Sequence, residues 1–116
     1  MILFRAFLMA VFCVIAGYTA IVVGMHGSDF LPLFNADILD MTWRGQFNTD
    51  FLCFLLLSAI WISWRNDFSP AGLMLGVVAV FGGMLFLSVY LLIASFAARG
   101  DAAVLLLGPR RAAARG

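Results

Sequence analysis

The sequence predicts an all-α integral membrane protein, a bundle of three transmembrane helices in which the connection between the first two lies on the membrane surface. Two observations predict this fold class. Hydrophobic residues make up 65% of the 116 residues and charged residues only 11%, which is more apolar surface than a soluble domain of this size can bury. The apolar residues also form three stretches, each close to the roughly 20 residues that an α-helix needs to cross a bilayer.

Charges and turn-forming residues divide the chain into one membrane domain, residues 1–100, and a short tail, residues 101–116. We expect transmembrane helices at about residues 2–25, 47–64 and 71–98. The first stretch is longer than the apolar part of a signal peptide, so we expect it to be retained as a helix. Pro70 suits the first turn of the third helix, because the N–H that proline lacks would be unpaired there.

The long connection between the first two helices and the tail both contain shorter apolar stretches. In the connection, Asn35 is expected to cap a short surface helix that ends at Trp43. In the tail, Asp101 precedes an apolar patch at residues 104–107, which Gly108 and Pro109 terminate before a basic end.

The arginines predict the orientation, because positively charged loops stay in the cytoplasm. With three crossings, the tail shares one side with the long connection, and these segments hold most of the arginines, namely Arg44, Arg99, Arg110, Arg111 and Arg115. The other side holds Arg5 and Arg65. This count favours a cytoplasmic C-terminus, and the complete absence of Lys and Glu indicates a GC-rich bacterial genome, hence a multi-pass protein of the bacterial cytoplasmic (inner) membrane.

Asp50 lies about one turn inside the predicted second transmembrane helix, where an unpaired carboxylate is costly. In one interpretation, Asn48, Thr49 and Asp50 cap the second helix, or Asp50 forms a structural ion pair with Arg99 or Arg44 across antiparallel helices. In the other, Asp50 is functional. Both interpretations make Asp50, Arg99 and Arg44 a candidate buried polar cluster.

Small residues recur at intervals of three and four on two of the predicted helices, where they let helix backbones approach closely. These residues are Gly72, Gly76, Ala79 and Gly83 on the third helix, and Ala16, Ala20 and Gly24 on the first. They predict either packing within the chain or an interface with another subunit or a second copy.

Aromatic and catalytic residue patterns complete the candidate sites. Trp43, Trp61 and Trp64 are expected at the membrane interfaces, where amphipathic rings gather. The single histidine, His26, argues against a bis-histidine haem or a metal site, and no catalytic motif is present. We therefore predict no enzyme activity and no cofactor, although a lipid, pigment or quinone at a subunit interface stays open; a net charge of only +1 argues against nucleic acid.

Three short segments carry a resemblance to known proteins: residues 47–51 (Phe-Asn-Thr-Asp-Phe), 61–65 (Trp-Ile-Ser-Trp-Arg) and 90–95 (Tyr-Leu-Leu-Ile-Ala-Ser). Over residues 45–108 the chain resembles short bacterial three-span membrane protein families of unknown function. The resemblance gives Asp50 and Tyr90 added interest, but it implies no activity.

The sequence predicts a non-enzymatic accessory or assembly subunit that packs against a larger membrane complex, for example an energy-transducing one. Its expected partners are membrane lipids together with other membrane subunits or copies of itself. One alternative is a homo-oligomeric transporter or pore in which Asp50 faces a shared cavity. Another is a membrane enzyme acting on a lipid or isoprenoid, which a convergence of Asp50, Arg44 and Arg99 would favour.

Overall fold

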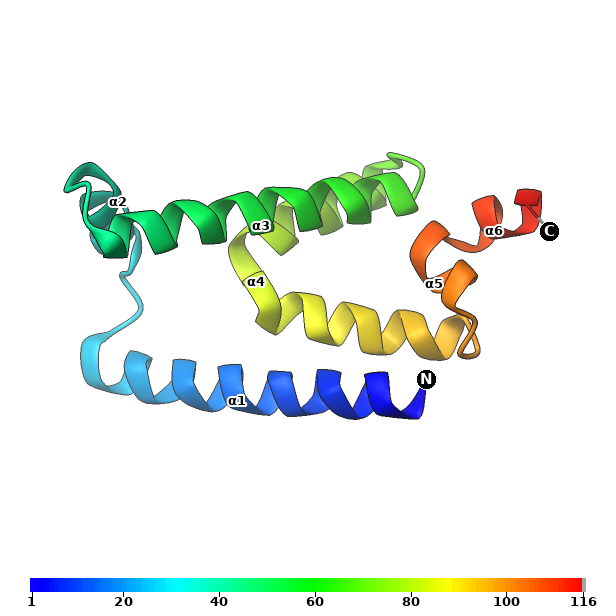
Figure 1. Ribbon diagram of the computed structural model, residues 1–116, viewed down its shortest axis with the longest axis horizontal. Helices are drawn as coiled ribbons and strands as arrows, with labels where there is room; N and C mark the ends of the chain where they lie inside the picture. Colours follow the sequence, from blue (N-terminus) through cyan, green and yellow to red (C-terminus); the bar gives the residue numbers. More distant parts are fainter. Residues whose placement is uncertain (116) are drawn as a thin grey trace.

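The computed structural model describes residues 1–115 and is all-α in that range (Figure 1). Its helices are α1 (Ile2–His26), α2 (Leu31–Leu39), α3 (Trp43–Arg65), α4 (Pro70–Ala97), α5 (Ala102–Leu107) and α6 (Pro109–Arg115). Three of them, α1, α3 and α4, are long and apolar enough to cross a membrane. The predicted all-α class with three membrane-length helices is confirmed. Gly116, the end of the predicted basic tail, lies outside the described residues.

Helix α3 begins at Trp43, one turn before the predicted start, because its first turn is too polar to be recognised from hydropathy. The prediction that Asn48, Thr49 and Asp50 cap this helix is therefore wrong. Thr49 instead donates a hydrogen bond from Oγ1 to the carbonyl oxygen of Gly45, 2.9 Å away, as residues inside a helix do. Helix α4 begins at Pro70 as expected, and Ser69 caps it by accepting a bond from the N–H of Gly72.

Helix α4 is broken at Gly83, whose φ of 57° and ψ of −143° fall outside the helical region. Its second half turns back, so both ends of α4 lie at the same end of the molecule (Figure 1). The hydroxyl of Tyr90 in the second half lies 3.0 Å from Nδ2 of Asn66, just before the first half begins. We call the two halves, residues 70–82 and 84–97, the α4 hairpin.

The hairpin overturns the topology drawn from three straight crossings. A Cβ at Gly100 would lie 3.6 Å from Cβ of Met1, so the end of α4 adjoins the start of α1. Both termini and the turn after Arg65 lie at one end of the molecule, while His26 and α2 lie at the other (Figure 1). The sequence had predicted that the C-terminal segment and the long connection share one end of the molecule. This prediction is wrong, because they lie at opposite ends.

The small residues of the first half of α4 pack within the chain. Gly72, Gly76 and Ala79 are buried, and a Cβ at Gly76 would lie 2.5 Å from Oγ of Ser63 on α3. Gly83 does not belong to this face, because it forms the break. On α1, Gly24 has nothing within 4 Å of its Cβ position, and Ala20 is exposed. Ala16 is half-buried. The predicted face on α4 is thus packed within the chain, whereas the one on α1 is exposed at Ala20 and Gly24.

The connection contains α2, which begins at Leu31 rather than at the predicted cap Asn35. Pro32 in the first turn favours this earlier start, since its fixed φ suits a helix beginning. Helix α2 packs on α3 at Gly45, which is buried against the backbone of Asp37. Exposed Arg44 lies 3.6 Å from the carboxylate of half-buried Asp37, so this ion pair links α2 to the start of α3.

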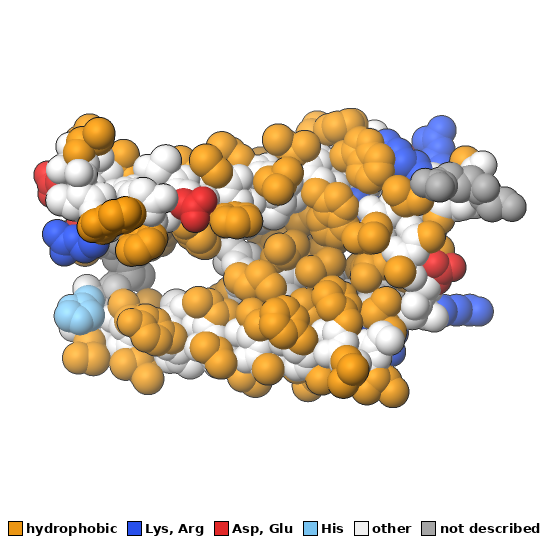
Figure 2. All heavy atoms as spheres, viewed as in Figure 1, with side chains coloured by type: hydrophobic (Ala, Val, Ile, Leu, Met, Phe, Trp, Pro, Cys, Tyr) orange, Lys and Arg blue, Asp and Glu red, His pale blue; other side chains and the backbone are white. Residues whose placement is uncertain are grey.

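The α4 hairpin leaves the space between α1 and α3 on the side of α2 without a helix. Helix α4 packs on both α1 and α3, but because the hairpin turns back at Gly83, it occupies only the part of the bundle near the termini. All residues of α1 from 17 to 26 are exposed. Figure 2 shows the molecule hollowed between α1 and α3 on the side of α2, within a surface that is mostly hydrophobic. We call the space between residues 17–26 of α1 and the first half of α3 the open half.

A pair of glycine substitutions tests this packing. Gly76→Leu should lower the free energy of unfolding in mild detergent by about 1–3 kcal/mol, because the new side chain meets Ser63 and the Ala59 carbonyl. The matched control Gly24→Leu should leave the free energy of unfolding unchanged, since its Cβ position is unobstructed. Equal losses of stability in the two variants would contradict the packing described.

Candidate functional site

The polar contacts that join the long helices to the C-terminal segment lie at the end of the molecule that holds both termini. There the end of α3, the second half of α4 and the short helices α5 and α6 meet. Ala94, Ala98 and Leu105 form a buried apolar cluster between α4 and α5, and Tyr90 packs against it. Asp101 starts α5 by accepting a bond from the N–H of Ala103 at 2.9 Å, so the chain turns back over this cluster immediately after α4.

Tyr90 is the centre of this site. Its hydroxyl oxygen accepts one hydrogen bond from Nη1 of Arg65 at 3.1 Å and another from Nδ2 of Asn66 at 3.0 Å. Trp61 meets the Tyr90 ring edge-on, with ring centroids 6.1 Å apart. Because Arg65 and Asn66 end α3 while Tyr90 lies in the returning half of α4, these bonds hold the α4 hairpin closed.

Arg65 also caps the C-terminal end of α5, where helix carbonyls have no partner within the helix. Its Nε donates to the carbonyl of Leu105 at 2.6 Å, and Nη2 lies 3.4 Å from the carbonyl of Val104. Nε1 of Trp61 donates to the carbonyl of Leu106 at 3.1 Å. A guanidinium at this position is also favoured by the negative end of the helix dipole. Among the described residues, no carboxylate forms an ion pair with Arg65.

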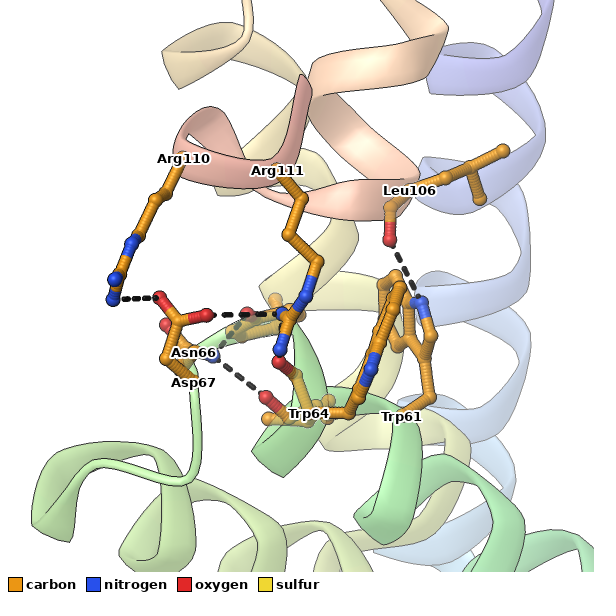
Figure 3. A network of polar contacts seen from close by, with 9 residues as sticks. Trp61, Trp64, Asn66, Asp67, Leu106, Arg110 and Arg111 are labelled. Atoms are coloured by element: carbon orange, nitrogen blue, oxygen red, sulfur yellow. Dashed lines mark hydrogen bonds and ion pairs between the residues drawn. The ribbon is translucent and has the colours of Figure 1, made fainter. Parts of the chain in front are cut away.

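Ion pairs hold helix α6 against the turn between α3 and α4 (Figure 3). Arg111 lies 3.1 Å from the carboxylate of Asp67, donates to the carbonyl of Trp64 and covers the Trp64 ring at 4.1 Å. Arg110 lies 3.8 Å from the same carboxylate but is largely exposed. The pair with Arg111 is the better shielded of the two, so it should contribute more to the stability of this contact.

Arg5 joins α1 to the end of α4. Its Nε donates to Oγ of the fully buried Ser95 and its Nη2 to the carbonyl of the same residue, both at 3.0 Å. The guanidinium also lies 3.9 Å from the centre of the Phe96 ring. An arginine inside an apolar helix is tolerated here because backbone, hydroxyl and aromatic groups surround it.

An apolar cavity of about 550 Å³ adjoins this polar site. It runs between α3 and the second half of α4, with Trp61, Leu105 and Leu106 at the polar end and Phe51 and Gly83 at the other. Phe4 of α1 also lines it. Ten residues of helix separate Phe51 from Trp61, so the cavity is about 15 Å long.

The prediction that Asp50, Arg44 and Arg99 lie together is wrong. Arg44 pairs with Asp37, and Arg99 lies exposed at the opposite end of the molecule, because the hairpin returns the end of α4 there. Asp50 is exposed on α3, about 10 Å along the helix from Trp43. Among the described residues it has no ion-pair partner.

The predicted interfacial tryptophans divide into two groups. Trp43 is 75% exposed at the start of α3, whereas Trp61 and Trp64 are half-buried and contact the C-terminal segment. Their placement at a membrane interface stays a prediction. The described residues contain no group of three or more His, Cys, Asp or Glu side chains able to hold a metal ion.

Sequence reasoning missed the roles of Arg5, Arg65 and Asn66. One signal was available, since an arginine at the edge of an apolar helix needs a partner. Its partners are backbone carbonyls and hydroxyls far along the chain, and such acceptors leave no mark on the sequence. Tyr90 was singled out only through the family resemblance.

Comparisons with known proteins add no relationship: no family model, no curated protein and no solved structure matches this chain. The resemblance over residues 45–108 to three-span membrane families thus stays a prediction.

A tyrosine substitution tests the centre of the site. Tyr90→Phe should lower the free energy of unfolding by about 1–3 kcal/mol, because two donors lose their shared acceptor. Unfolding in mild detergent measures this loss. Tyr18→Phe is the matched control, since Tyr18 is 69% exposed on α1 and its substitution should have no effect. If Tyr90→Phe proves as harmless as Tyr18→Phe, these hydrogen bonds do not hold the hairpin.

Proposed function

We propose that this small membrane protein is a non-enzymatic accessory or assembly subunit, which binds a larger membrane protein through the open half of its bundle. The observation that carries the proposal is the exposed second half of α1. Residues 17–26 are all exposed, and nothing lies within 4 Å of the Cβ positions of Gly17 and Gly24. Small residues on an unoccupied helix face allow a partner helix to approach closely.

Asp50 indicates which kind of side chain a partner helix would present to this protein. Asp50 lies about 10 Å from Trp43 at the start of α3, beyond the polar first turn of the helix. An exposed carboxylate there is costly in lipid unless another chain supplies a donor. A partner helix with a basic or hydrogen-bonding side chain at the depth of Asp50 would satisfy it. The proposal therefore specifies both an apolar contact along α1 and a polar contact at Asp50.

A homo-oligomeric pore or transporter is the second candidate, and the same Asp50 favours it. Several copies arranged around a common axis would place their carboxylates in a shared, hydrated cavity. Copy number distinguishes the two candidates. An enzyme has less support, because the convergence of Asp50, Arg44 and Arg99 that would have favoured it is not found among the described residues.

Purification from native membranes tests the subunit proposal. A tagged wild-type chain should co-purify with other membrane proteins in fixed stoichiometry, and Gly24→Leu and Asp50→Ala should each reduce their recovery by about tenfold, the change expected for roughly 1.4 kcal/mol of lost binding. Leu73→Ala, on the exposed face of α4, is the control that should retain the partners. Recovery of a homo-oligomer alone would support the pore instead.

We also propose that both termini lie in the cytoplasm of a bacterial cell. Six of the seven arginines belong to segments at the end that holds the termini, the exception being Arg44. Positively charged segments are retained in the cytoplasm.

Reporter fusions test this orientation. A fluorescent protein that matures only in the cytoplasm should fluoresce when fused to either terminus. A phosphatase active only outside the cytoplasm should be active when inserted at Ser28. Fluorescence at the N-terminus alone would show that α4 crosses the membrane as a straight helix, which contradicts the hairpin.

A further inference from the structure

We propose that the apolar cavity between α3 and the α4 hairpin binds one acyl chain of an anionic phospholipid, whose phosphate lies at the arginine-rich end of the molecule. The cavity adjoins the open half at Phe51 and Gly83 and extends from there toward the termini, away from α2. It also extends the polar site, whose side chains close the cavity at one end.

The dimensions of the cavity match one leaflet of a bilayer. It runs about 15 Å from Trp61 to Phe51, which is half of the roughly 30 Å hydrocarbon thickness. The first half of α4 spans about 20 Å before the break, so Gly83 lies near the middle of the bilayer. A lipid from the leaflet at the arginine-rich end would therefore place its chain terminus near Gly83 and its headgroup beyond Trp61.

The lining of the cavity suits a hydrocarbon chain rather than a polar ligand. Aromatic and branched aliphatic side chains form the walls, including Phe54, Leu87 and Leu91. The hydroxyl of Ser58, the only polar side chain there besides Trp61, bonds to the carbonyl of Leu55 in its own helix at 2.8 Å. A volume of about 550 Å³ falls within the range of binding sites for small molecules.

Charge selects the headgroup, because acyl chains are common to all phospholipids. Arg99 and Arg110 are exposed at the end of the molecule where Trp61 and Leu106 close the cavity. The carboxylates of Asp67 and Asp101 lie at this end too, but Asp67 is paired with Arg110 and Arg111, and Asp101 caps α5. Arginines therefore remain in excess there, and they attract anionic headgroups.

Photolabelling of the full-length protein in phosphatidylcholine vesicles tests the site. The probe is a phosphatidylglycerol that carries a diazirine midway along one acyl chain. Labels should concentrate on the cavity-facing residues of α3 and of the second half of α4. Leu87→Trp, which fills the cavity, should reduce this labelling by about tenfold. Leu73→Trp, on an exposed face of the same helix, is the matched control and should not reduce it.

A comparison of two probes with different headgroups tests the preference for an anionic lipid. A phosphatidylcholine with the same diazirine chain should label the cavity less, by about fivefold for each contributing arginine. Arg99→Gln with Arg110→Gln should abolish the difference between the two probes, whereas Arg44→Gln at the other end should preserve it. If Leu87→Trp does not fold, Leu55→Trp, at a half-buried position of α3, fills the same cavity. Labelling spread evenly over exposed faces, or equal labelling by the two probes, would overturn the proposal.

Discussion

The backbone conformation at Gly83 is the constraint on which the rest of the structure depends. A positive φ combined with a ψ of −143° is open to glycine and strongly disfavoured for other residues. At this residue a helix of 28 residues, long enough to cross the bilayer, becomes two halves that begin and end on the same side. The position of the C-terminal segment, the cavity beside the break and the open half all follow from that one turn.

A break in a transmembrane helix has to be compensated, since lipid offers no hydrogen bonds and little hydrophobic drive for packing. The compensation lies at the other end of the hairpin. Tyr90 accepts bonds from Arg65 and Asn66, Arg65 caps α5, and Ser95 holds Arg5. These bonds join helices that are distant in sequence, and each involves polar groups that would be costly if exposed to hydrocarbon. Polar contacts thus supply the specificity that apolar packing alone cannot give in lipid.

The fold class was predictable from the sequence because hydropathy and length report directly on membrane-length helices. Helix ends were less predictable: α3 begins in the polar turn at Trp43, which hydropathy does not detect. The direction of α4 was missed for a different reason. Gly83 looked like one more small residue at a packing interval, and only its backbone φ and ψ, together with the distant partners of Tyr90, reveal that it is a turn. The ion pair of Asp50 with Arg99 failed as a consequence, because it assumed a straight α4, whereas Arg44, the other expected partner, pairs with Asp37.

The two halves of the bundle therefore differ in how the space between α1 and α3 is filled. Near the termini, α4 fills the space between α1 and α3, and arginines, tryptophans and Tyr90 close the end. Toward α2, α1 and α3 face each other without a helix between them, and Asp50 is exposed on the first half of α3. Lipid can fill an apolar gap at little cost, but it cannot satisfy a carboxylate. Asp50, rather than the apolar surface around it, is thus the group that lipid alone leaves without a hydrogen-bonding partner.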